Sequence, residues 1–224
     1  MPVALHPQPE TSQVPVASEP RLPHEAVPIR TIGLRHLPAL RKHLLALDAN
    51  DRYLRFGYSA TDEHILRYLE QIHYDRDEIF GIFNRQLELI AMAHLAFSLD
   101  PKFNSCAEFG VSVAKSARGR GLGKQLFERA VMHARNEGVH QLFIHALSEN
   151  TAMLKIARSA GAEILRDGSE SEAHLLLPPA NFDSRVAELI NEQVAITDYH
   201  LKAQARQFRQ ALAFLPGWRQ PSES

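Results

Sequence analysis

Residues 107–138 predict a strand followed directly by a helix. In the strand, apolar side chains occupy every second position, at Ala107, Phe109, Val111 and Val113. In the helix they recur every three or four residues, at Leu122, Leu126, Ala130, Val131 and Ala134. Gly138 stands where a helix ends in a left-handed residue. The chain is therefore expected to pass from the strand into the helix through a turn at 114–121.

The same patterns divide the rest of the chain between 28 and 177 into strands and helices. Helices are predicted at 34–48, after an N-cap at Thr61, and at 148–161. Strands are predicted at 28–32, 78–83, 87–97, 141–147, 162–165 and 173–177, with turns at 84–86 and 167–168. This order predicts an α+β layered sandwich, in which a mixed, mostly antiparallel sheet carries helices on both faces.

Two segments flank this predicted domain, which we place at residues 28–178. Residues 1–27 contain six prolines and predict a disordered tail. Residues 179–224 predict a long helix, whose apolar stripe must pack against the domain or against a second copy in a homodimer. The stripe consists of Val186, Ile190, Val194, Leu201, Ala205, Phe208, Leu212 and Leu215.

Composition narrows the classes of function. Lys and Arg number 25 against 26 Asp and Glu, so no basic surface for nucleic acid or acidic membranes is expected. The single cysteine, Cys106, permits no intramolecular disulfide, and no apolar run has the length of a signal peptide or membrane span. A cytoplasmic enzyme is therefore the expectation. The 12 histidines are scattered without metal-ligand spacing, so no metal is expected.

The turn before the central helix has the chemistry of a phosphate site. Its sequence, Arg118-Gly119-Arg120-Gly121-Leu122-Gly123, places glycines where unpaired helix N–H groups and the positive end of the helix dipole point outward. Glycines also let the backbone approach an anion closely. Neither the P-loop pattern nor the dinucleotide fingerprint GxGxxG fits the spacing of this turn. A plain, tight connection is the alternative interpretation.

The pattern that does fit, R-x-x-G-x-G, resembles the pyrophosphate-binding loop of the GNAT superfamily of acyl-CoA-dependent N-acyltransferases. The next helix in that family carries N-x-x-A-x-x-L-Y-x-x-x-G-F. Asn150, Met153, Ile156 and Gly161 fall on its frame here, whereas Ala157 stands at the tyrosine that reprotonates the leaving thiolate. The resemblance spans residues 29–177 and implies acetyl-CoA as acyl donor and an amine as acceptor.

The resemblance also implies the residues of the site. Val111 and Val113 would pair with the pantetheine arm, and Glu108 is the candidate general base, with a paired carboxylate on the sheet as the alternative role. The remaining candidate cofactor-binding residues are Arg118, Gly119, Arg120, Gly121, Leu122, Gly123, Lys124 and Asn150.

The acceptor half of the site is less defined by the sequence. Residues 51–57 resemble a run in bacterial protein-lysine acetyltransferases, or form a turn with Arg52 and Arg55 in solvent. Small amines, amino acids, aminoglycosides and protein lysines therefore all stay open as acceptors. Because Ala157 replaces the tyrosine, a module that senses acyl-CoA and signals through the C-terminal helix is the alternative function.

Overall fold

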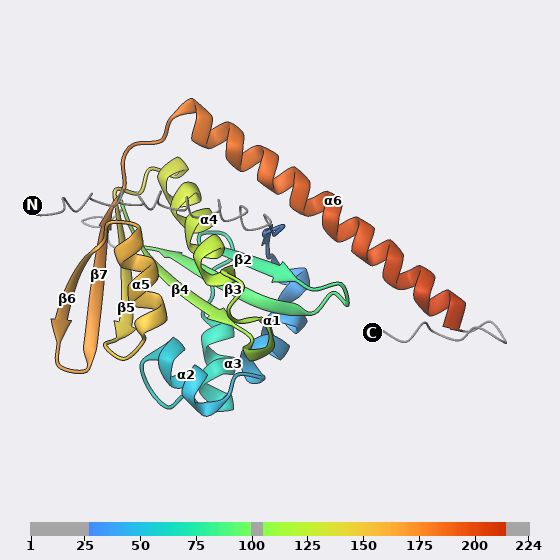
Figure 1. Cartoon of the computed structure of the whole chain (residues 1–224), viewed down its shortest axis with the longest axis horizontal. Coiled ribbons are helices and arrows are strands. Elements are labelled where there is room, and N and C mark those ends of the chain that lie inside the picture. Colours follow the sequence, from blue (N-terminus) through green and yellow to red (C-terminus); the bar gives the residue numbers. More distant parts are fainter. Residues whose placement is uncertain (1–26, 100–104, 214–224) are drawn as a thin grey trace, which may run out of the picture.

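A seven-stranded sheet forms the centre of the computed structural model, with the order β1-β2-β3-β4-β5-β7-β6 (Figure 1). The structure describes residues 27–99 and 105–213, with side chains up to residue 207. Every neighbouring pair is antiparallel except β4 and β5. The predicted fold class is thereby confirmed. The strands are β1 (Arg30–Thr31), β2 (Glu78–Phe83), β3 (Leu89–Phe97), β4 (Cys106–Val113), β5 (Gln141–Leu147), β6 (Glu163–Asp167) and β7 (Glu170–Leu176).

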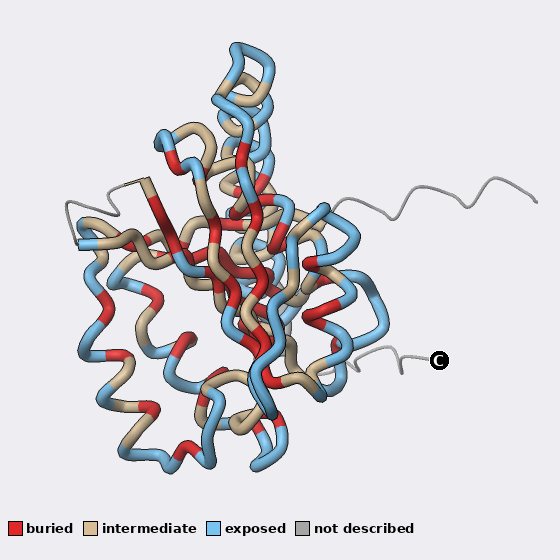
Figure 2. Tube along the Cα trace, turned by 90° about the vertical axis from the view of Figure 1, so that its left-hand side faces the viewer, coloured by how far each residue is buried: buried red, intermediate tan, exposed pale blue. Residues whose placement is uncertain are grey.

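Helices α4 (Leu122–Asn136) and α5 (Thr151–Ser159) cover one face of the sheet, and their apolar stripes form the larger core with it. In that core Phe109 of β4 packs edge-on against Phe127 of α4, with ring centroids 5.1 Å apart. Figure 2 shows how buried positions gather along the central strands. The apolar face that the sequence predicted for β4 is therefore the face that packs against the helix.

The opposite face carries α1 (Leu37–Leu45), α2 (Ala49–Phe56) and α3 (Asp62–Glu70), preceded by the short 3-10 helix η1 (Leu34–His36). The expected single helix at 34–48 is wrong at its C-terminal end. Asp48 caps a new helix through its side chain, which accepts a hydrogen bond from the Asp51 amide at 2.9 Å. Residues 51–56 are therefore helical and not a turn, and Gly57 ends the helix at φ 80°. The predicted N-cap at Thr61 is confirmed.

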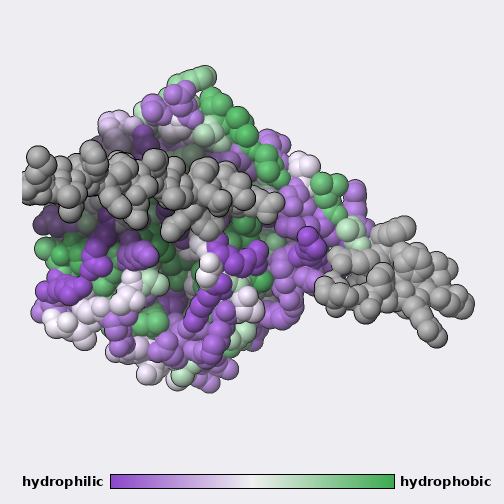
Figure 3. Space-filling model, viewed as in Figure 1, coloured by the Kyte–Doolittle hydropathy of each residue, from purple (hydrophilic) through white to green (hydrophobic). Residues whose placement is uncertain are grey.

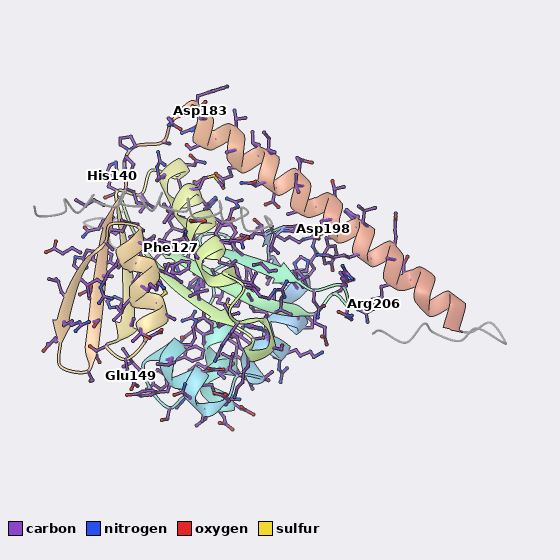
Figure 4. The ribbon with its side chains drawn as sticks, viewed as in Figure 1. Phe127, His140, Glu149, Asp183, Asp198 and Arg206 are labelled. Carbon is purple, nitrogen blue, oxygen red and sulfur yellow. The ribbon has the colours of Figure 1, made fainter. Side chains whose placement is uncertain are left out.

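The C-terminal helix α6 (Phe182–Ala213) lies across the domain, but not through the stripe that the sequence singled out. Its inner face is largely polar: Glu188 accepts hydrogen bonds from Arg129 at 2.6 Å and from Asn136, and contacts His133 at 2.5 Å. Lys202 and Arg206 donate to backbone carbonyls of the β2–β3 hairpin, at Phe83 and Gln86. Figure 4 shows Arg206 near the C-terminal end of the helix. The helix thus docks through charge pairs and hydrogen bonds, and through the Tyr199 ring, which packs against Arg30 and Phe83.

The predicted apolar stripe of α6 faces away from the domain. Ile190, Val194 and Leu201 are 57%, 53% and 62% exposed, and Figure 3 shows hydrophobic surface along this helix. The helix does dock on the domain, which is one of its two predicted roles, but Ile190, Val194 and Leu201 of the stripe do not take part in this docking. The stripe members Phe208, Leu212 and Leu215 lie beyond the described side chains, as residues 1–26 of the predicted tail lie outside the described residues.

Candidate active site

The two parallel strands at the centre of the sheet separate soon after they meet. Residue pairs between β4 and β5 run only from Cys106–Gln141 to Glu108–Phe143. Beyond Glu108 the strands diverge, and a cavity of about 860 Å³ opens between them and the loop after α2. Phe109, Gly110 and Val111 of β4 line one side. This wedge leaves the β5-facing edge of β4 without a neighbouring strand.

The glycine-rich loop lies at the end of β4 and leads into α4. Gly119 and Gly121 adopt φ of 76° and 73°, a conformation that L side chains rarely take. Gly121 is the N-cap of α4 and no side chain caps the helix, so its first-turn N–H groups are left for a ligand. An added Cβ at Gly123 would lie 3.5 Å from Ile156 of α5, a distance of ordinary contact. The loop thus has the features of an anion cradle.

The cations around this loop differ in what they contact. Arg118 forms an ion pair with the buried carboxylate of Asp51 in α2, so its charge is already partnered. Lys124 lies 3.5 Å from Glu128 one turn along α4, with both side chains exposed. Arg120 is exposed and has no ion pair within the described residues. Arg120 is therefore the loop cation that is free to meet a bound anion.

Glu108 lies where the wedge begins and is an exposed residue of its wall. It pairs across the sheet with Ala96 of β3 and Phe143 of β5, neither of which can bind its charge. Across the described part of the chain the Glu108 carboxylate makes no ion pair or hydrogen bond. The alternative role of a paired structural carboxylate therefore has no partner to support it.

The other candidate positions are divided between the wedge and its surroundings. Val111 lines the cavity, whereas Val113 lies next to the loop, where its carbonyl accepts a hydrogen bond from Arg118 Nε at 3.4 Å. Asn150 also lines the cavity and is the N-cap of α5, since its Oδ1 accepts from the Met153 amide at 3.1 Å. Ala157 is fully buried in the core. The structure thus offers no hydroxyl at the position of the expected tyrosine.

The side of the cavity formed by α2 and the loop after it contains residues 54–58, which overlap the run at 51–57 that the sequence assigned to the acceptor half. Arg55, for which a place in solvent was the alternative, lines the wedge and donates to the Tyr68 hydroxyl of α3 at 3.0 Å. That hydroxyl lies 2.8 Å from Nδ1 of His94 on β3, and His94 Nε2 lies 3.3 Å from Asp77. Burial, reinforced by the Arg55 charge, lowers the pKa of His94 to about 4, so its ring is neutral near pH 7.

A second buried histidine lies beside the same strand. His43 Nδ1 is 3.0 Å from the Leu89 carbonyl, and Nε2 is 2.8 Å from the Ser112 hydroxyl. Because a carbonyl only accepts, Nδ1 carries the proton and Nε2 accepts from Ser112. Burial lowers the pKa of His43 to about 4. This pair joins α1 to β4 as a neutral polar contact within an otherwise apolar interface.

Among residues 27–99 and 105–213, no group of three or more His, Cys, Asp or Glu side chains is placed to hold a metal ion. No helix in these ranges combines the length and the apolar character needed to cross a membrane.

The fold has relatives among solved structures. The GNAT domain of S. lividans PAT is 20% identical, with a TM-score of 0.57 over 66% of this chain and 89% of that one. The ribosomal-protein-alanine N-acetyltransferase of Brucella melitensis is 23% identical, with a TM-score of 0.54 over 66% and 99%. The yncA protein of Salmonella typhimurium, solved with acetyl-CoA, is 18% identical, with a TM-score of 0.53 over 68% and 95%. At these identities the likeness concerns the fold.

A family model connects the sequence itself to these folds. Residues 45–162, more than half of the chain, match the model described as the acetyltransferase (GNAT) family. The matched range contains β4, the glycine-rich loop, α4, β5 and α5, which together form the wedge and its anion cradle. The chain belongs to the GNAT family of acetyltransferases.

Proposed function

We propose that this protein transfers the acetyl group of acetyl-CoA to a primary amine by direct attack of the amine. The observation that carries the proposal is the separation of β4 from β5 beside an uncapped helix N-terminus. An extended pantetheine arm can pair with the free edge of β4 at Val111 and Val113, while the pyrophosphate receives N–H groups of the loop. This arrangement would hold the thioester next to Glu108.

Acetyl-CoA supplies a thioester whose C–S bond breaks as the new C–N bond forms, with the electron pair leaving on sulfur. The chain supplies position and a proton acceptor. An alkylammonium has a pKa near about 10.4, so Glu108 must accept a proton, directly or through water, before the nitrogen can attack. A backbone N–H on the free edge of β4 would stabilise the developing oxyanion. One proton returns to the thiolate and one is released to solvent.

The alternative function is a module that binds acyl-CoA without turnover and signals through α6. It is favoured by a single observation, the buried Ala157 in place of a tyrosine acid. Both functions require the wedge and the loop to bind the cofactor. Only the transferase requires Glu108 to face an acceptor, and the open wall around Glu108 supports the transferase.

The deciding experiment has two arms. Acetyl-CoA should raise the thermal unfolding temperature by the amount that mass action gives for its Kd. Thiol release from acetyl-CoA should then be followed with a panel of amines at equal concentration. Protection together with amine-dependent thiol release supports the transferase. Protection without thiol release from any amine supports the sensing module, and no protection contradicts both functions.

We also propose that the exposed stripe of α6 forms a homodimer seam. Leucine, isoleucine and valine side chains more than half exposed along one helix face form an apolar surface of the kind that a second copy buries. The inner face of the same helix is already held to the domain through Glu188, Lys202 and Arg206. The helix would therefore be fixed on one side and free to pair on the other.

A further inference from the structure

The guanidinium of Arg55 lies directly over Gly110 of the central strand. A Cβ built on Gly110 would stand 2.7 Å from each of three Arg55 atoms, Cζ, Nη1 and Nη2. A side chain at position 110 would therefore displace the arginine. Both residues line the wedge in which the thioester is proposed to lie.

A chain of hydrogen bonds holds this guanidinium from behind. Arg55 Nη2 donates to the Tyr68 hydroxyl, because a guanidinium cannot accept, and the same hydroxyl lies 2.8 Å from His94 Nδ1. His94 Nε2 lies 3.3 Å from Asp77 without the geometry of a hydrogen bond, and the buried Asp77 carboxylate is bound by Arg76 at 2.7 Å. These contacts hold the Arg55 head in place from behind.

Most of the donors of Arg55 remain unused. A guanidinium has five N–H groups, and within the described residues only the bond to Tyr68 is made. Its Nε is buried without a partner, and the side chain forms no ion pair with a carboxylate in these ranges. A fixed, unpaired guanidinium in a cavity is suited to a carboxylate, which accepts two parallel N–H bonds.

The position of Glu108 limits which carboxylate this can be. Glu108 and Gly110 are alternate residues of β4, so they share a face and lie about 7 Å apart along the strand. Hydrogen bonds of about 2.8 Å at either end leave only a few ångströms between the two bound groups. An amine and a carboxylate on one carbon fit this separation better than groups at the two ends of a long chain.

We propose that Arg55 binds the carboxylate of the acceptor, and that the acceptor is a free α-amino acid whose α-amine lies beside Glu108. This inference rests on the proposed transferase function. The amine would lose its proton to Glu108 and form the amide bond as the thioester C–S bond breaks. Arg55 acts here as a specificity residue that holds the substrate.

The opposite wall of the wedge limits the side chain of the acceptor. The β6–β7 hairpin contributes Arg166 together with three acids, Asp167, Glu170 and Glu172, so this wall is negative on balance. An acceptor with a second carboxylate would place it near these acids. Neutral or basic side chains are therefore expected to be preferred over acidic ones.

The first test compares L-amino acids with their carboxamides, which keep the amine and the side chain but lose the charge. Free acids should show kcat/KM at least about tenfold above their carboxamides, because a guanidinium fixed in a cavity rejects an analogue that cannot pair with it. The amine of a carboxamide is less basic, so more of it is unprotonated near pH 7, and this difference alone would favour the carboxamides. Equal or better use of carboxamides, or a preference for Nα-acetyl-lysine amide, would overturn the inference.

The second test removes the guanidinium or moves it. Arg55→Gln should reduce the ratio of kcat/KM for acid over carboxamide to about one, and Gly110→Ala should do the same while keeping the arginine. Arg67→Gln, an exposed arginine of α3 away from the wedge, is the matched control and should keep the ratio. Thermal unfolding of each variant shows whether it is folded. A ratio that persists in a folded Gly110→Ala or Arg55→Gln protein contradicts the role of Arg55.

A third measurement does not need turnover. Calorimetric titration of free amino acids and carboxamides into protein saturated with coenzyme A should show binding of the acids alone, and its loss in Arg55→Gln. If no amine releases thiol but this selective binding is found, the transferase function fails and the carboxylate site stands. If carboxamides are acetylated and bound as well as acids, the transferase stands and the carboxylate site fails.

Discussion

The carboxylate of Asp51 in α2 forms an ion pair with Arg118, the first residue of the glycine-rich loop. Asp51 is nearly buried, whereas 45% of the Arg118 side chain is exposed. The helix that carries Arg55 is thus tied directly to the proposed pyrophosphate loop. This ion pair joins the acceptor side of the wedge to the cofactor side.

The pairing predicts different effects for the two arginines of the loop. Arg120→Gln should weaken acetyl-CoA binding by about 3- to 10-fold, because its unpaired charge would face the pyrophosphate, and the loss should shrink at high salt. Arg118→Gln should weaken binding less but lower the free energy of unfolding by about 1–3 kcal/mol, since it leaves Asp51 without its partner. Calorimetric titration and urea unfolding measure both effects. The reverse order of the affinity losses would assign the pyrophosphate contact to Arg118.

Glu108 is predicted to accept the proton. Glu108→Gln keeps the shape of the side chain and should lower kcat by at least about 100-fold with little change in the KM for acetyl-CoA. The loss should become smaller at high pH, where the solvent supplies free amine. Steady-state kinetics from pH 7 to 9 measure this. Near-normal turnover in a stable Glu108→Gln variant would exclude Glu108 from the mechanism.

The glycines of the loop are predicted to be needed for binding. Gly121→Glu should abolish acetyl-CoA binding, because it adds bulk and negative charge where the pyrophosphate would lie. Gly138→Glu is the matched control: Gly138 also has a positive φ, 81°, and open space around its Cβ position, but it lies at the far end of α4. Both variants should lose similar stability, and only the first should lose affinity. Intact acetyl-CoA affinity in folded Gly121→Glu protein would contradict the loop assignment.

The seam on α6 predicts an oligomeric state. The double variant Ile190→Asp, Leu201→Asp should be a soluble monomer, because a dimer would have to bury its new carboxylates. Asn191→Asp adds a charge at an exposed position beside the stripe and should leave the dimer intact. Light scattering at several concentrations distinguishes the two states. A wild-type protein that is monomeric at high concentration would remove the proposed seam.

The buried histidines predict how stability depends on pH. The pKa values of His43 and His94 are about 4 in the folded protein, against 6.5 for an ordinary histidine, mainly because both are buried. Unfolding should therefore take up protons between pH 6.5 and 4. The free energy of unfolding should be highest above pH 6.5 and should fall as the pH is lowered through this window. Urea unfolding at half-unit pH steps measures the slope. His43→Gln should reduce the number of protons taken up on unfolding by about one. A wild-type free energy of unfolding that does not change across this pH window would contradict the lowered pKa values of the two histidines.

A further loss of stability is expected at lower pH from the anchor of α6. Burial alone would raise the pKa of Glu188, but hydrogen bonds from His133, Arg129 and Asn136 outweigh it and lower the pKa to about 2. The stability that Glu188 contributes is present above its ordinary pKa of 4.5 and is lost as the pH falls toward 2. This window lies mostly below that of the histidines.

The sequence predicted the parts of the fold that depend on local patterns. The alternation in 107–113, the glycines of the loop and the cap at Thr61 act within a few residues, so each could be read from the sequence alone. The break between α1 and α2 was missed because leucines continue through 44 and 47 and hide the cap at Asp48. The apolar spacing favoured one continuous helix, whereas the cap favoured a break, and the sequence alone does not show which of the two signals prevails.

The contacts of Arg55 on the acceptor side of the wedge could not be predicted because they join distant segments. Arg55 meets Gly110 across 55 positions of sequence, and His94 reaches Tyr68 from a different element. Nothing near Arg55 in the sequence marks its partners. The docking face of α6 was misjudged for a related reason: an apolar stripe suggests burial, but the complementary charges of Arg129 and Glu188 bring the opposite face inward.

The divergence of β4 from β5 also divides the sheet mechanically. Within the sheet, three residue pairs join the half formed by β1 to β4 to the half formed by β5, β7 and β6, and the core beneath α4 and α5 spans both halves. A long molecule seated in the gap would contact both halves and act as a non-covalent crosslink between them. Cofactor binding should then make the two halves unfold as one cooperative unit. The concentration of acetyl-CoA would thereby also set how readily the domain opens between β4 and β5.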